Sequence, residues 1–584
     1  MPKCVKSAAI YSGIPPLSTC YIGAMHGRIG VAALVLATAC SSKSEVKTNG
    51  SGIGGGKPFT IVALAEMRGQ IGPCGCTTDP LGDIARTSQI AAGIRAEGPT
   101  LVLDAGSVLY SKNPIPPHLE AQEELKADLL ISTYKEALGV AAVGLGPADL
   151  AKGTDKLRLP RHVVNLAADS KVAVEAPKIV DVGGARVGVF GVIAEGAVPA
   201  ATLAITDPIA AGKAAASKLR GDGAEIVVAL VQAASKKDAV KLVREIGGAD
   251  IAIAGLGASA PEPEDVEPEA TKVDGTWLVI PGNRGQVISK IQVTVRGDWT
   301  PLADAVGDGA AKAKIATIDK QLAAADADLE KMKADKDADP AFVRQKQAER
   351  DQLAKDKAAL AATPLIVPAK GSYFTLEQVR INKPLACDTK VQSNVTAFYK
   401  AAGEANVKAA AGQKVAAPAK GAASYVGTEA CSDCHSDAVD FWKTTRHAHA
   451  WETLVERGQE FDYDCIGCHV TGWDKPGGSN LASNDTLRDV QCETCHGPGS
   501  IHVAKGGEER PSAIVRLPDE KLCATQCHTK EHSDTFDLQP YLRDVTGPGH
   551  GANLRTKLGD GPTGGELRKA GLAKAGRMGP NCVR

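Results

Sequence analysis

The sequence predicts a multidomain chain in which an α/β sandwich is followed by a helical hairpin and then by a mainly helical and loop region. Three observations lead to this fold class. The chain has 584 residues, enough for about three or four domains with separate cores. Short apolar strands alternate with helical segments between residues 58 and 300. Four clusters of two cysteines and a histidine lie between residues 431 and 528.

The N-terminal segment has the pattern of an export signal followed by a linker. A basic stretch ends at Arg28, an apolar run covers residues 29–39, and Cys40 follows. The run is too short to span a bilayer, and the small residues before Cys40 resemble those of a bacterial lipoprotein signal. We therefore expect residues 1–40 to be a signal region, with translation starting at Met25 and lipidation of Cys40, and residues 41–57 to be a flexible linker. An ordinary cleaved signal with a bystander cysteine is the alternative, and both predict an exported protein, periplasmic or held at the outer membrane.

Residues 58–300 form the predicted α/β domain. Runs such as FTIVALAE, ARVGVFGVI and EIVVALVQA are short and apolar, and most end at glycine or a polar residue, as buried strands of α/β folds do. Their order and spacing, including the closing VIPGNRGQVISKIQVTV, resemble the metallophosphoesterase domain of the 5′-nucleotidase family. The resemblance implies a sandwich fold and, in active members, a two-metal centre.

The metal ligands that this resemblance implies are nearly all replaced. Glu66 is the one family position where a metal-binding side chain is kept. The other positions hold Arg68, Ser107, Pro147, Ala148, Gln232, Leu256 and Ala258. We therefore predict a catalytically inactive scaffold used for binding or docking, with metal-dependent nucleotidase or phosphoesterase activity as the alternative.

A charged, alanine-rich connector follows the α/β domain. Apolar residues recur at three- and four-residue spacing in residues 301–365, and Pro340 interrupts the pattern, which predicts an antiparallel helical hairpin. This hairpin is either a spacer or dimer contact, or a solvated arm packed on the first domain. Residues 366–423 are predicted as a helical segment and a linker.

The GPCGC loop places Cys74 and Cys76 just after the first strand. The candidate roles are a disulfide with Cys387 or Cys582, a metal site, or a redox contact. An exported protein meets an oxidising compartment, which favours the disulfide.

Four cysteine and histidine motifs predict covalent haem. Three have the spacing C-x-x-C-H, and the fourth, CATQCH, has one extra residue between the thiols. Two thiols add to the vinyl groups of one haem, and the adjacent histidine then binds the iron from the proximal side. Zinc sites also use paired cysteines but need no histidine after each pair. The predicted attachment thiols are Cys431, Cys434, Cys465, Cys468, Cys492, Cys495, Cys523 and Cys527, and the proximal ligands are His435, His469, His496 and His528.

Residues 424–551 resemble the tetrahaem cytochrome c-552/4 type. The resemblance is carried by YVGTEACSDCHSDAVDFWKTTRHAHAW and CETCHGPGSIHV. It implies four haems c, distal iron ligands at His447, His502 and His550, and one haem without a second protein ligand. His449 and His532 are interpreted as surface or supporting residues. Residues 552–584 form the remaining C-terminal tail.

Charge and cofactor together indicate the class of function. The chain has 67 basic and 68 acidic residues, so no overall field attracts nucleic acid. Closely spaced haems suit electron transfer, and we expect redox partner proteins in the cell envelope and membrane contact through the lipid anchor. The alternative is a haem enzyme that acts on a small nitrogen or sulfur compound at the five-coordinate iron.

Overall fold

The computed structural model describes residues 56–73, 76–297, 301–335 and 339–583, which lie in one compact unit. The predicted signal region, the lipidation of Cys40 and the thiol of Cys74 lie outside the described residues. In the described part of the chain, no helix combines the length and apolar character needed to cross a bilayer.

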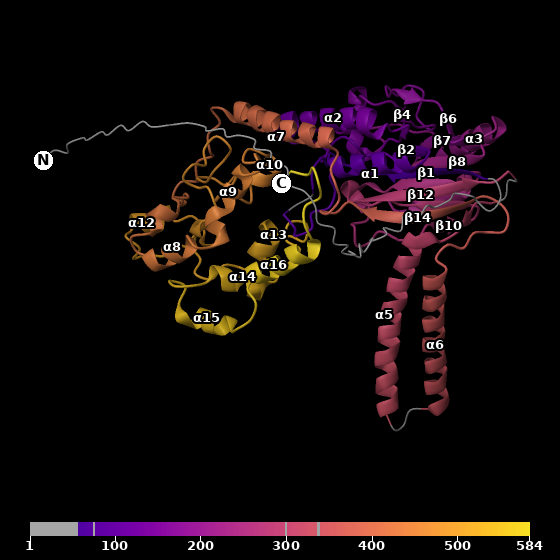
Figure 1. Ribbon diagram of the computed structural model, residues 1–584. Coiled ribbons are helices and arrows are strands. Elements are labelled where there is room, and N and C mark those ends of the chain that lie inside the picture. The colour runs from indigo at the N-terminus through magenta and orange to yellow at the C-terminus, as the bar shows by residue number, and fades with distance from the viewer. Residues whose placement is uncertain (1–55, 74–75, 298–300, 336–338, 584) are drawn as a thin grey trace, which may run out of the picture. The chain divides into compact units, whose positions relative to one another are not determined.

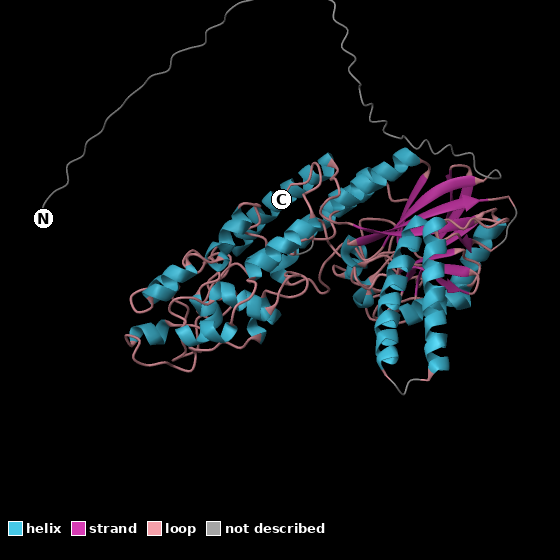
Figure 2. Ribbon diagram, turned by 60° about the horizontal axis from the view of Figure 1, so that its bottom comes forward, coloured by secondary structure: helices cyan, strands magenta, loops and turns pink. Residues whose placement is uncertain are grey.

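Two six-stranded sheets form the centre of the α/β domain (Figures 1 and 2). The first has the order β13 (Ala303–Asp304), β14 (Tyr373–Arg380), β12 (Val287–Val295), β1 (Lys57–Leu64), β2 (Thr100–Asp104) and β3 (Ala142–Val143). The second has the order β10 (Thr271–Val273), β11 (Thr276–Val279), β9 (Ile251–Gly255), β8 (Ile226–Gln232), β7 (Ala185–Ile193) and β6 (Lys178–Val182). β4 (Arg161–His162) and β5 (Val174–Glu175) form a separate pair.

The two sheets pack face to face, and helices cover their outer faces. Successive side chains of a strand point to opposite faces, so Val62 and Leu64 of β1 join the helical core while Phe59 and Ile61 face the second sheet. The helices on the first sheet are α1 (Ile84–Glu97), α2 (Glu120–Thr133) and α7 (Thr389–Ala410), and those on the second are α3 (Pro208–Gly221) and α4 (Lys236–Ile246). The result is a sandwich of four layers, which agrees with the sandwich fold that the resemblance implies.

The predicted hairpin consists of α5 (Gly307–Ala334) and α6 (Pro340–Ala362), which run side by side in Figures 1 and 2. Ion pairs join the two helices, with Arg350 lying 2.8 Å from Asp326 and Lys357 lying 2.5 Å from Asp319. The start of α5 is buried, whereas α6 has no buried residue among those described. Within the single chain, the hairpin therefore packs on the first domain at the start of α5 and leaves α6 without buried residues among those described.

Residues 366–423 contain a strand as well as the predicted helix. β14 pairs with β12 in antiparallel register and buries Phe374 and Leu376 between the sheets. Two inward-facing residues are enough to specify a strand when a neighbouring strand edge is available. The first domain therefore extends past the hairpin to α7, beyond the predicted end at residue 300.

The cytochrome region consists of short helices and loops. The helices are α8 (Ser436–Trp442), α9 (Ala450–Val455), α10 (Tyr463–Ile466), α11 (Cys492–His496), α12 (Ser500–Ala504), α13 (Lys521–Gln526) and α14 (Leu538–Val545). Buried hydrophobic side chains are few between residues 424 and 551; in the described structure they are Val439, Ala450, Trp451, Leu454, Ile466, Val470, Leu481 and Leu487.

The C-terminal tail forms α15 (Ala552–Leu558) and α16 (Gly564–Ala575) and returns to the α/β domain. A disulfide joins Cys582 to the buried Cys387. The predicted pairing of either residue with the GPCGC loop is therefore wrong, and Cys76 is exposed with a free thiol.

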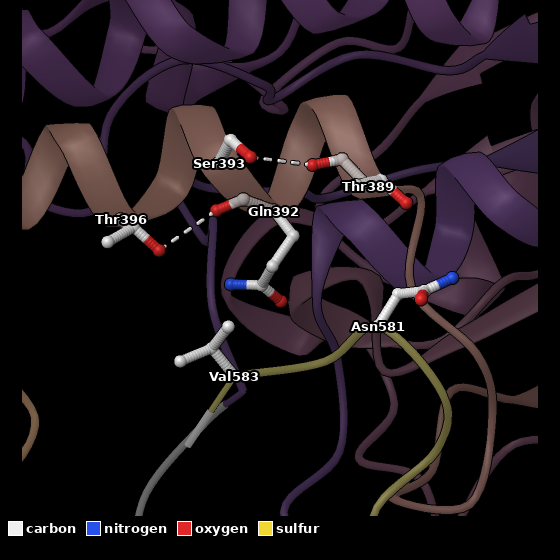
Figure 3. A pocket seen from close by; sticks show the side chains of 6 residues that line it. All are labelled: Thr389, Gln392, Ser393, Thr396, Asn581 and Val583. Atoms are coloured by element: carbon white, nitrogen blue, oxygen red, sulfur yellow. Dashed lines mark hydrogen bonds between the residues drawn. The ribbon is translucent and has the colours of Figure 1, made fainter. Parts of the chain in front are cut away.

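A pocket of about 310 Å³ lies between α7 and the tail (Figure 3). Its lining residues are Thr389, Gln392, Ser393, Thr396, Asn581 and Val583. Ser393 and Thr396 donate hydrogen bonds to carbonyl oxygens of their own helix. No lining residue is titratable, and we assign no chemistry to this pocket.

Candidate functional site

The four motifs each place their cysteines and histidine on a tight turn. In the first motif (Cys431–His435) the amide of His435 donates to the carbonyl oxygen of Cys431 at 3.0 Å. In the fourth motif (Cys523–His528) the amide of His528 donates to the carbonyl oxygen of Cys523 at 2.8 Å, despite the extra residue. The same bond closes both turns, so the insertion widens the turn without moving the histidine away from the first thiol.

Three histidine rings of the motifs face a second histidine ring. The ring centroids are 6.5 Å apart for His435 and His502, 6.3 Å for His447 and His528, and 6.5 Å for His496 and His550. Two imidazoles bound to opposite sides of one metal ion, each at about 2 Å, would have their centroids about 6 Å apart. The structure thus brings together the three predicted distal histidines with three of the four proximal ones, at the separation that a shared iron requires.

The histidine of the second motif (Cys465–His469) differs from the other three. No described histidine ring faces His469 at a comparable distance. Its Nδ1 atom lies 2.5 Å from the carbonyl oxygen of Ala450, so this nitrogen carries the proton and donates it. Nε2 is left with its lone pair for a metal ion, which is the arrangement that metal-binding histidines use.

Other histidines of the site are held in the same way. His496 Nδ1 lies 2.8 Å from the carbonyl oxygen of Val515, and His502 Nδ1 lies 2.6 Å from that of Glu509. Burial lowers the pKa of His528 to about 4, and it also lowers the pKa of His447. Neutral imidazoles are the form that binds iron, so the residues present fit haem c.

Aromatic side chains support the fourth motif. Phe536 stacks on the ring of His528 at a centroid distance of 4.9 Å, and Tyr541 packs edge-on at 5.1 Å. The aromatic stretch that follows CATQCH in the sequence therefore contacts its proximal histidine.

Cysteines of different motifs also come together. The thiol of Cys431 lies close enough to that of Cys492 for each to shift the pKa of the other, and the same holds for Cys468 and Cys527. Each thiol marks the edge of the haem that it would hold. The first motif is therefore next to the third, and the second is next to the fourth.

The two remaining histidines of the region stand apart from the ring pairs. His449 is exposed, and its Nε2 atom lies 3.1 Å from the carbonyl oxygen of Lys443. His532 is partly exposed and faces no proximal ring in the described structure. Both positions agree with the interpretation as surface or supporting residues.

In the α/β domain, the replaced ligand positions meet in a buried cluster. The carboxylate of Glu66 accepts a hydrogen bond of 3.1 Å from Gln232 and one of 3.0 Å from the amide of Gly257. Asp149, nearby in the fold, forms a fully buried ion pair with Arg161 at 3.0 Å. Among the described residues, no group of three histidine, cysteine, aspartate or glutamate side chains could hold a metal ion.

Glu66→Gln is expected to stabilise the protein above pH 7. Burial raises the pKa of Glu66 from 4.5 to about 7, against the hydrogen bonds from Gly257 and Gln232. Below pH 4.5 the Glu66 carboxyl is protonated in both the folded and the unfolded protein, and its full contribution to the free energy of unfolding is present. This contribution is lost as the pH rises through 7, because the buried group then ionises. The increase in the free energy of unfolding caused by Glu66→Gln should therefore be about 1–3 kcal/mol larger at pH 8 than at pH 5.

Urea unfolding followed by circular dichroism at both pH values measures this difference. Glu195→Gln, at an exposed position, is the matched control and should change nothing. An equal effect of Glu66→Gln at pH 5 and pH 8 would contradict the raised pKa. Assays of both proteins with nucleotides and divalent metal ions should detect no phosphoester hydrolysis.

The motifs and ring pairs define a c-type cytochrome region joined to an α/β sandwich. Residues 430–497 match the family described as cytochrome c554 and c-prime. Cytochrome c-554 of Nitrosomonas europaea is 36% identical over 104 residues, which are 15% of this chain and 43% of that protein. The chain thus spans less than half the length of this relative. The family implies covalently bound haem c.

Solved structures that are similar to parts of this chain include two phosphoesterases and one cytochrome. The 5′-nucleotidase precursor of Thermus thermophilus is 19% identical, with a TM-score of 0.39, over 64% of this chain and 63% of that one. The calcineurin-like phosphoesterase YfkN of Bacillus subtilis is 17% identical, with a TM-score of 0.34, over 42% of this chain and 87% of that one. Reduced cytochrome c554 of Nitrosomonas europaea is 30% identical, with a TM-score of 0.15, over 18% of this chain and 65% of that one.

Proposed function

We propose that this protein is an exported tetrahaem electron carrier of the cell envelope, anchored to the membrane through a lipid on Cys40. The observation that carries the proposal is the set of three imidazole pairs with centroids 6.3–6.5 Å apart. An iron with two imidazole ligands has no open position, so it exchanges electrons rather than binding a substrate. The α/β domain is then an inactive phosphoesterase scaffold that docks redox partner proteins.

The adjacency of the thiols supports the transfer of electrons within the chain. Cys431 lies against Cys492, and Cys468 lies against Cys527. Covalent attachment at these thiols would bring haem edges of two motifs together in each case. When bound, the haems supply reversible one-electron chemistry, and the chain's histidines and thiols fix their positions.

A haem count and an electron paramagnetic resonance spectrum test the proposal. The pyridine haemochrome assay should give four haems per chain, and the ferric protein should show three low-spin centres and one high-spin centre. A count of three would show that the fourth motif, with its extra residue, does not attach haem. Four low-spin centres would show that the iron held by His469 also has a second ligand.

A second candidate function is catalysis at the His469 position. It is favoured by one observation: no second imidazole faces His469 among the described residues. Nitrite, hydroxylamine and nitric oxide, added separately, distinguish the two functions. A shift of the high-spin signal followed by turnover supports an enzyme, whereas an unchanged signal supports a carrier.

A further inference from the structure

A buried polar network joins helix α2 of the α/β domain to the loop that carries the second motif. Gln122 of α2 is fully buried, and its Nε2 atom donates to Asp462 at 2.7 Å and to Asp464 at 3.2 Å. Its Oε1 atom accepts from Asn406 of α7 at 2.8 Å and from the amide of Tyr463 at 3.3 Å. One side chain of the first domain therefore holds both aspartates beside Cys465.

The aspartates in turn fix the short helix on which Cys465 lies. Asp462 is the N-cap of α10, and its carboxylate accepts from the amide of Asp464 at 2.9 Å. A helix of this length has no stability of its own. The orientation of Cys465 thus depends on what holds Asp462 and Asp464 in place.

Lys126 is the cation at the centre of this network. Its side chain is 7% exposed, and Nζ lies 2.5 Å from Asp464 and 3.0 Å from Glu123. Glu123 also accepts from the amide and the hydroxyl of Ser111 at 2.7 and 2.8 Å. Burial lowers the pKa of Lys126, but the attraction of Asp464 and Glu123 outweighs burial, and the net effect raises the pKa above its ordinary value.

Removing this lysine would leave a group of carboxylates without their nearest cation. The ammonium group of Lys126 is attracted by the carboxylates of Glu123, Asp462 and Asp464. Asp464 is also attracted, more weakly, by Lys112. Breaking a buried ion pair by removing one partner leaves the other charge uncompensated. The excess negative charge would lie next to Cys465, at the edge of the second haem.

We propose that Lys126 is a positioning residue through which the α/β domain sets the reduction potential of the second haem. The inference rests on the proposed function, since it requires haem at Cys465 and Cys468. Negative charge near a haem stabilises the ferric form and lowers its potential, and positive charge does the opposite. The inactive domain then contributes to electron transfer by holding and charging one haem site.

Spectroelectrochemical titration of the full-length haem protein tests this role. Lys126→Met removes the cation at similar length and should shift the potential of one haem, the high-spin one, downwards. Asp464→Asn removes an anion and should shift the same haem upwards. The double variant should return towards the wild-type value. Lys152→Met is the matched control, because Lys152 pairs with Glu120 and Glu124 on the same helix and should shift no haem.

The two single variants separate electrostatic control from loosening of the interface. Loosening of the interface would shift the reduction potential in the same direction in both variants. Shifts of equal sign, or no shift in either variant, would therefore overturn the proposal. If Lys126→Met does not fold, Asp464→Asn alone must still raise the potential. Peptide mass analysis is used first to test for haem on Cys465 and Cys468. Absence of haem from these cysteines would refute the proposed function as well. Unshifted potentials with haem present would refute only the role of Lys126.

Discussion

Replacing His447 with alanine is expected to convert one low-spin haem into a high-spin haem. The His447 ring faces that of His528 at 6.3 Å, with the ring planes 33° apart. Loss of the distal imidazole leaves the fourth iron with one protein ligand, which opens a coordination position. The ferric spectrum should lose one of its three low-spin signals and gain a second high-spin signal.

His449→Ala is the matched control for this change. His449 lies in the same short turn, but its side chain is 60% exposed and its Nε2 atom is beside the carbonyl oxygen of Lys443. The spectrum of this variant should be that of the wild type. If His449→Ala removed the low-spin signal and His447→Ala did not, the assignment of the distal ligand would be wrong.

The histidines that face one another could be named from the sequence as candidate iron ligands, but their pairing could not. His447 follows the first motif closely in the sequence, yet its ring faces the histidine of the fourth motif. His502 follows the third motif and faces His435 of the first. Each motif is a local pattern of the residues that would attach one haem. The folding of the loops between motifs determines which histidine reaches the opposite face of that haem.

The same limit applies to the contacts between domains. The resemblance of the strand order to a known family implied the sandwich, and the strands themselves could be located because short apolar runs are a local signal. Gln122, Glu123 and Lys126 lie in a helix whose charged residues are typical of a solvated face, and nothing local distinguishes them from exposed neighbours. Their burial depends on Asp462 and Asp464, which are distant in sequence.

Preventing haem attachment is expected to unfold residues 424–551 and leave the α/β domain folded. The sandwich has three extensive hydrophobic clusters, one between the sheets and one on each outer face. The cytochrome region has a single small cluster built on Trp451, Ile466, Val470, Leu481 and Ala410. Ordering each residue costs about 1–2 kcal/mol of backbone entropy, and so few buried side chains cannot offset that cost over such a long segment. The macrocycles must supply the missing apolar contacts.

Limited proteolysis with mass analysis, on protein made in a host without haem attachment machinery, measures this loss. Cleavage should fall throughout residues 424–551 and spare the sheets, and the haem-loaded protein should resist cleavage in both regions. Without reducing agent, the fragment that contains Cys582 should stay linked to the α/β fragment through Cys387. Because haem binds only to the folded arrangement of ligands, its binding free energy is part of the folding free energy of this region. A protease-resistant haem-free fragment covering residues 424–551 would show instead that the protein part alone specifies the fold.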